Sequence, residues 1–208
     1  MSLQKITSEK PELTSRGIEE EILNRCLSSK QLEIAGEYES ARLALGDRWQ
    51  RVGERPNLIG LSEPTQAELL LRAGTLSGWI GSAQQIEGAQ EFAKDLISES
   101  ARMFERLGLV EKAADAQVDL AVCYWRAGAL DEARVMLHQV LDQTAPDSES
   151  RLRSLANLAL LERVAGRFRE ALKIQTEAAP LFEASSNHAL RGNFHNVCAQ
   201  VLKELGLA

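Results

Sequence analysis

The chain has 208 residues, of which 44% are hydrophobic and 5% aromatic, and its net charge is −6. Enough apolar residues are present for a core, which excludes wholesale disorder, and the low aromatic content favours packed helices over a sheet. The acidic charge argues against general attraction to nucleic acid or anionic membranes. Residues 151–208 differ, because they hold eight Lys and Arg against five Asp and Glu, and they could face an acidic ligand.

Residues 1–14 form a polar stretch that we expect to be disordered or derived from a cloning tag. No apolar run in the chain approaches the ~18 residues of a membrane span. The three cysteines, Cys26, Cys123 and Cys198, are far apart and form no CxxC motif, which fits a reducing cytoplasm better than a secreted disulfide scaffold. We therefore expect a cytoplasmic protein without a membrane partner.

Helical patterns recur from residue 15 to the end of the chain. They predict nine helices, at about residues 15–34, 38–53, 65–86, 89–106, 110–127, 130–144, 148–165, 168–185 and 188–205. Residues 51–64 contain two prolines and two glycines and widen the distance from Gly36 to Gly88 to 52 residues, which indicates an inserted loop. Within this loop we expect the pair Leu58-Ile59 to pack against the helices rather than to serve as an exposed contact.

A short pattern, Ala-Gly-x-apolar-x-x-Ala, repeats at residues 35–41, 127–133 and 165–171. Glycine takes the left-handed conformation that ends a helix, the apolar residue anchors the next helix, and the second alanine allows the two helices to approach closely. The spacings between Gly88, Gly128, Gly166 and Gly206 are 40, 38 and 40 residues, so the pattern predicts a tandem array of helix pairs.

Three glycines also share one face of a helix, since Gly74, Gly78 and Gly81 follow i, i+4 and i+7 spacing. Such a face allows another backbone to approach closely. Packing in the core is the favoured interpretation, and a bound peptide lying across the face is the alternative.

The segment Leu120-Ala121-x-x-Tyr124-x-x-x-Gly128-x-x-x-x-Ala133-x-x-x-Leu137 resembles a tetratricopeptide repeat. Similar but sparser matches begin at Ile80-Gly81 and Leu158-Ala159. The period of 38–40 residues is longer than the family's usual 34, as in bacterial regulators with long repeats. The resemblance implies an all-α, right-handed superhelical solenoid of antiparallel helix pairs. It covers residues 15–208 as one domain, which we expect to be a fragment of a longer array.

Residues that carry chemistry are sparse. His195 and Cys198, with His188 before them, have a spacing that could begin a zinc site, but Cys198 falls on a packing position and a buried free cysteine is the favoured interpretation. No GxSxG motif, phosphate loop or acid–base pair is present. We therefore expect no enzyme activity, no metal and no cofactor.

A groove is expected on the inner curve, which the first helix of each pair lines. Among the candidates, Trp125 could supply an apolar shelf, the basic side chains could meet carboxylates, and the amides could bond a peptide backbone. The family's two-carboxylate clamp is not reproduced. The candidates are Trp79, Gln85, Val122, Trp125, Arg126, Arg153, Asn157, Arg163, Asn193, Asn196, Gln200 and Lys203.

Three functions follow from these patterns. The first is a scaffold that binds a peptide or helix of a protein partner in the groove, as the regulatory or adaptor part of a larger bacterial protein. The second is self-association into a homodimer through the last helix, whose apolar residues have no following helix to cover them. The third, RNA binding by helical repeats, is disfavoured by the acidic charge.

Overall fold

The computed structural model describes residues 15–207, and these residues form nine α-helices and one short 3₁₀ segment without a strand. The all-α fold expected from the sequence is therefore confirmed, whereas the expectation for residues 1–14 lies outside the described residues. The helices are α1 (Ser15–Ile34), α2 (Tyr38–Ala44), α3 (Glu63–Ala83), α4 (Ala89–Arg106), α5 (Val110–Arg126), α6 (Leu130–Gln143), α7 (Glu149–Val164), α8 (Phe168–Ala184) and α9 (His188–Glu204).

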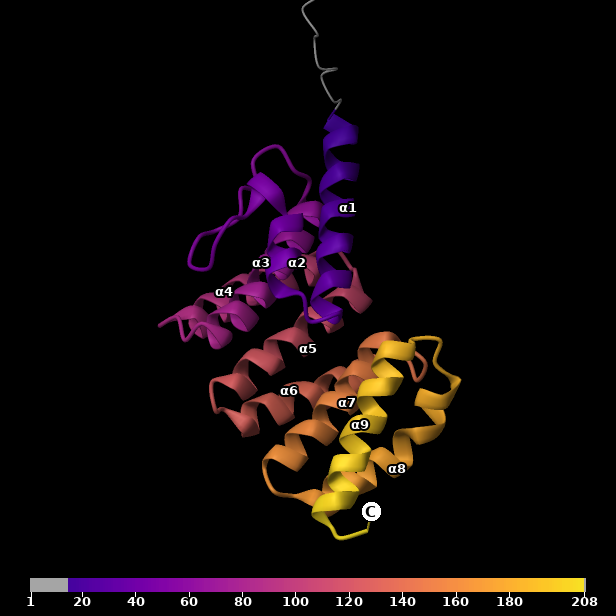
Figure 1. The fold of residues 1–208 in the computed structure, drawn as a ribbon. Helices are drawn as coiled ribbons and strands as arrows, with labels where there is room; N and C mark the ends of the chain where they lie inside the picture. The colour runs from indigo at the N-terminus through magenta and orange to yellow at the C-terminus, as the bar shows by residue number, and fades with distance from the viewer. Residues whose placement is uncertain (1–14, 208) are drawn as a thin grey trace, which may run out of the picture.

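The helices stack as antiparallel pairs along one direction (Figure 1). Each helix packs against its neighbours in the chain, and the first helices of successive pairs also touch: α1 contacts α3, α3 contacts α5, α5 contacts α7, and α7 contacts α9. This arrangement is the tetratricopeptide-like solenoid that the repeat pattern predicts. It places α1, α3, α5, α7 and α9 along one continuous surface.

The repeated turn has the geometry that the sequence pattern predicts. Gly88, Gly128 and Gly166 have positive φ angles of 74°, 86° and 75°, which only glycine adopts without strain. The alanines that follow the turns, Ala133 and Ala171, are fully buried. Small side chains at these positions let the second helix of each pair pack directly on the first.

The glycine face of α3 packs in the core against α4. A Cβ atom at Gly81 would lie 2.2 Å from the Cβ of Ala89, and one at Gly74 would lie 2.6 Å from Cγ1 of Ile97. The two helices therefore approach more closely than any larger residue would permit, and the favoured interpretation of this face is confirmed.

The predicted helix over residues 38–53 was too long. α2 ends at Ala44, a 3₁₀ segment follows at Gly46–Arg48, and Gly46 has a φ of 63°. The backbone turns here because Trp49, in extended conformation, is buried and donates its indole N–H to the carbonyl of Glu54 at 2.8 Å. Burial of this large ring outweighs two further turns of exposed helix.

The inserted loop consequently begins a few residues earlier than predicted and ends at α3, whose first turn contains Pro64. Proline suits that position because the first helical N–H groups have no partner within the helix. Leu58 packs against the core as expected, whereas Ile59 is 83% exposed.

The C-terminal end of the array is held by aromatic stacking. Phe182 of α8 and Phe194 of α9 are both buried, and their rings stack with centroids 3.8 Å apart.

Between residues 15 and 207, every helix falls short of the length or the apolarity needed to cross a bilayer.

Candidate functional site

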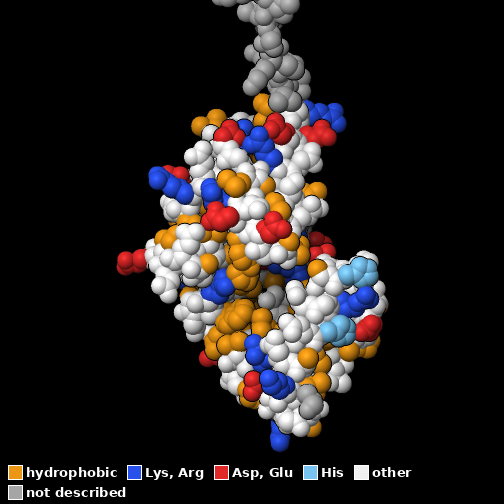
Figure 2. Space-filling model, in the orientation of Figure 1, with side chains coloured by type: hydrophobic (Ala, Val, Ile, Leu, Met, Phe, Trp, Pro, Cys, Tyr) orange, Lys and Arg blue, Asp and Glu red, His pale blue; other side chains and the backbone are white. Residues whose placement is uncertain are grey.

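A pocket of about 260 Å³ lies on the surface formed by the first helices of the pairs. Its walls come from α1, α3, α5, α7 and α9, together with Tyr38 at the start of α2. Figure 2 shows the molecule hollowed near its middle, where hydrophobic and basic side chains gather. The pocket is thus the point at which the first helices of the four pairs and α9 contribute to one concavity.

One wall of the pocket is a stack of three planar groups. The rings of Tyr38 and Trp79 lie parallel with centroids 5.0 Å apart, and the guanidinium carbon of Arg126 lies 3.7 Å from the centroid of Trp79. This distance is well within the range of a cation–π interaction. Burial lowers the pKa of Arg126, because desolvation disfavours the charge.

The floor of the pocket is a buried ion-pair network centred on Arg72 of α3. The Arg72 side chain is 1% exposed, and its Nη1 lies 2.8 Å from Oε2 of Glu33 on α1 while its Nη2 lies 3.5 Å from Oδ2 of Asp119 on α5. Burial disfavours the charge of Arg72, but the two carboxylates outweigh that effect and raise its pKa. Burial raises the pKa of Glu33, because Arg72 offsets its desolvation only in part.

The same network continues to α7 through Arg153. This side chain pairs with the carboxylates of Asp115 and Asp119, and Lys30 of α1 binds the second oxygen of Asp115 at 2.7 Å. Burial alone would raise the pKa of Asp115, but Arg153 and Lys30 outweigh it and hold that pKa below its usual range. Four first helices are therefore joined by charge across the pocket floor.

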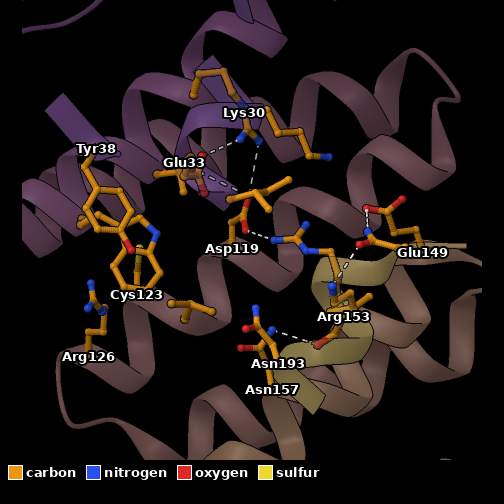
Figure 3. A pocket seen from close by; sticks show the side chains of 18 residues that line it. Lys30, Glu33, Tyr38, Asp119, Cys123, Arg126, Glu149, Arg153, Asn157 and Asn193 are labelled. Atoms are coloured by element: carbon orange, nitrogen blue, oxygen red, sulfur yellow. Dashed lines mark hydrogen bonds and ion pairs between the residues drawn. The ribbon is translucent and has the colours of Figure 1, made fainter. Parts of the chain in front are cut away.

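The opposite wall carries side-chain amides from α7 and α9 (Figure 3). Nδ2 of Asn157 donates to the carbonyl of Arg153 at 2.9 Å, which leaves its oxygen free to accept. Asn193 is exposed and has no hydrogen-bond partner within residues 15–207. Leu190 adds an apolar contact at the edge. This wall offers donors and acceptors of the kind that bind a peptide backbone.

The structure brings half of the sequence-predicted groove residues into this pocket. Those that line it are Trp79, Val122, Arg126, Arg153, Asn157 and Asn193.

The other six lie elsewhere. Trp125 packs against the hydrophobic cluster of α5, α6 and α7, and Gln85 is an exposed residue beyond the end of α3. Arg163 belongs to the last turn of α7. The remaining three follow Asn193 further along α9: Asn196, Gln200 and Lys203.

Sequence reasoning missed the charged floor of the pocket. Arg72 stands within the apolar run Leu69–Leu76, and Asp119 stands between Val118 and Leu120. A charge inside an apolar helix face is the signal that could have drawn attention to both residues, because such charges are buried only when paired. Their partner Glu33 carries the same signal, since it stands between Leu32 and Ile34.

The cysteines and histidines do not form a metal site in the described part of the chain. Between residues 15 and 207, no three His, Cys, Asp or Glu side chains gather closely enough to hold a metal ion. Cys26 and Cys123 are buried, whereas Cys198, for which the sequence favoured burial, is half-buried. His195 lies 3.1 Å from a carboxylate oxygen of Glu183.

A family model described as tetratricopeptide repeat matches residues 112–184, which run from the first turn of α5 to the end of α8. A search of curated proteins finds no match. Repeats of this family generally serve as scaffolds for protein–protein interaction. The matched segment forms two helix pairs with the predicted turns at Gly128 and Gly166, so residues 112–184 are similar to tetratricopeptide repeats in both sequence and helix arrangement.

Proposed function

We propose that this chain is a protein-interaction scaffold that binds a peptide or a helix of its partner in the pocket between α1, α3, α5, α7 and α9. The observation that supports it is the composition of the pocket, which joins an aromatic wall, a rigid charged floor and a wall of side-chain amides. An aromatic face and free amides are suited to an extended polypeptide, whose backbone offers alternating donors and acceptors.

The charged floor adds rigidity to this binding surface. Arg72, Asp119 and Arg153 hold one another in place before any ligand arrives. A preformed site loses less conformational entropy on binding than a mobile one. In this proposal the protein has a binding role without catalysis, and it is the regulatory or adaptor part of a larger bacterial protein.

The test is a selection of short random-sequence peptides on the wild-type chain, followed by binding to two matched variants. Val122→Arg places a long charged side chain in the pocket, whereas Val135→Arg places the same side chain on the exposed outer surface of α6. We expect Val122→Arg to abolish binding and Val135→Arg to leave it intact, with circular dichroism confirming that both are folded. Equal binding by both variants would refute the pocket as the peptide site.

A second candidate function is self-association through α9. Three apolar side chains of this helix, Val197, Leu202 and Leu205, are only half-buried, and Leu207 beyond it is 65% exposed. A second copy could cover this surface. Light scattering over a dilution series tests the idea, and a molecular mass of one chain at every concentration would reject it.

A further inference from the structure

One of the cations that line the pocket has no carboxylate partner among the described residues. Four cations line the pocket, and three of them, Lys30, Arg72 and Arg153, are paired with carboxylates at the pocket floor. The fourth, Arg126, has no carboxylate partner within residues 15–207. Among the described residues, the pocket thus holds an unpaired cation, Arg126, and an unpaired carboxylate, Glu149, whose side chain contacts the amide of Asn187.

Arg126 is also held in a fixed orientation. Its guanidinium carbon lies 3.7 Å from the centroid of the Trp79 ring, which in turn stacks on Tyr38. The Nη1 atom is buried and lacks a hydrogen-bond acceptor. The Arg126 side chain nevertheless lines the pocket, so the parts of its guanidinium that face the pocket are available to a ligand that carries an acceptor.

We propose that Arg126 binds a carboxylate group of the peptide that occupies the pocket. The inference rests on the proposed function and names the chemistry of its ligand. A guanidinium presents parallel donors that match the two oxygens of a carboxylate, and an aromatic ring behind it keeps the plane of the donors fixed. The source of the carboxylate is an acidic side chain or the free C-terminus of the peptide.

The surroundings of Arg126 select for a single negative charge. Glu33 and Asp119 are already paired with Arg72 and Arg153, and the carboxylate of Glu149 also lines the pocket, so the lining offers a further anion no cation besides Arg126 that lacks a carboxylate partner. A carboxylate carries one charge and can pair with Arg126, which Figure 3 shows on the side of the pocket away from Glu149. Figure 3 shows Arg126 and Tyr38 on one side of the pocket and Asn157 and Asn193 on the other, so the amides are placed to bond the peptide that carries the carboxylate.

Arg126→Gln tests the proposal, with Arg169→Gln as the matched control because Arg169 is exposed on α8 and does not line the pocket. Peptides that bind the wild type and fail to bind Val122→Arg are remade in two forms. One form replaces each Glu or Asp by Gln or Asn, and the other carries an amidated C-terminus.

We expect one of the two forms to bind the wild type about 10- to 100-fold more weakly, as for the loss of a charge-assisted hydrogen bond. On Arg126→Gln, the affinity of the same modified peptide should be less than about threefold below that of the unmodified peptide. The reason is that this variant already lacks the guanidinium that binds the carboxylate. Arg169→Gln should behave as the wild type. The form that loses affinity identifies the source of the carboxylate.

Pocket-dependent peptides that bind the wild type and Arg126→Gln equally would overturn this inference and leave the proposed function standing. A failure to obtain any pocket-dependent peptide would instead count against the proposed function. A second readout needs no peptide: N-acetylglycine and N-acetylglutamate amide are titrated while the Arg side-chain Nε–Hε NMR signals are followed. A shift of the signal that disappears in Arg126→Gln supports the inference, and no shift of that signal overturns it.

Discussion

Replacing Arg72 by Met tests how much the buried network contributes to stability. Methionine keeps most of the side-chain volume but removes the positive charge that faces Glu33 and Asp119. The carboxylates of these two residues would remain buried without that charge between them. Removing one partner of a buried ion pair costs about 3–5 kcal/mol, since an uncompensated charge remains. The Arg72 side chain is 1% exposed, so water cannot take the place of the guanidinium, and we expect the loss to fall in this range.

The assay is urea unfolding followed by far-UV circular dichroism. Arg106→Met serves as the control, because Arg106 pairs with Glu63 at 3.9 Å on an open surface, and the free energy of unfolding should change by less than about 1 kcal/mol. The double variant Arg72→Met/Glu33→Gln should recover part of the loss, because the amide needs no counter-charge. A loss below about 1 kcal/mol for Arg72→Met would refute this account of the network.

The pH dependence of the same variant has a definite sign. Burial already raises the pKa of Glu33 in the wild type, and removal of Arg72 raises it further. A carboxyl whose folded pKa lies above its unfolded value stabilises the fold at low pH and loses that contribution as the pH rises. The stability gap between Arg72→Met and the wild type should therefore narrow as the pH falls from neutral to about 5. A gap that widens on acidification would contradict the assignment.

Two further predictions concern packing and reactivity. Gly81→Ala should lower the free energy of unfolding by about 1–3 kcal/mol, because the added methyl group clashes with α4. Gly192→Ala lies in an open part of α9 and should raise the free energy of unfolding by about 0.5–1 kcal/mol. Thermal unfolding measures both variants, and equal effects would refute the close approach of α3 and α4. Burial raises the pKa of Cys26 and of Cys123 to about 12, so at pH 8 a thiol reagent should modify Cys198 rapidly and the other two only slowly. Fast reaction at all three thiols in the folded protein would count against their burial.

The turns were predictable because their requirements are local. A glycine at a helix end permits the left-handed backbone conformation, and an alanine five residues later permits close contact between the two helices. Gly128, with its positive φ, and Ala133, which is fully buried, show both effects. The early end of α2 was not predictable in this way. It depends on burial of Trp49 against residues far along the chain, and nothing in the helical pattern of residues 38–53 reveals that competition.

The site was half predictable for a different physical reason. Helical phase identifies the face of each helix that lines the inner surface, but it does not identify the turn that lies at the pocket. The pocket crosses the array obliquely: it touches the end of α5 at Arg126 and the beginning of α9 at Asn193, so Lys203 on the same face of α9 lies too far along that helix. The pairing of Arg72 with residues of two other helices likewise required the fold.

The contact between Lys30 and Asp115 has a mechanical consequence. In most helical-repeat arrays each repeat contacts only its neighbours, so the array can change its curvature one repeat at a time. Here α1 is tied directly to α5, across the intervening α3–α4 pair, at a distance of 2.7 Å. The ion pair therefore restrains the positions of α1 and α5 relative to each other, whereas α8 and α9 are held by their contacts with α7 and with each other.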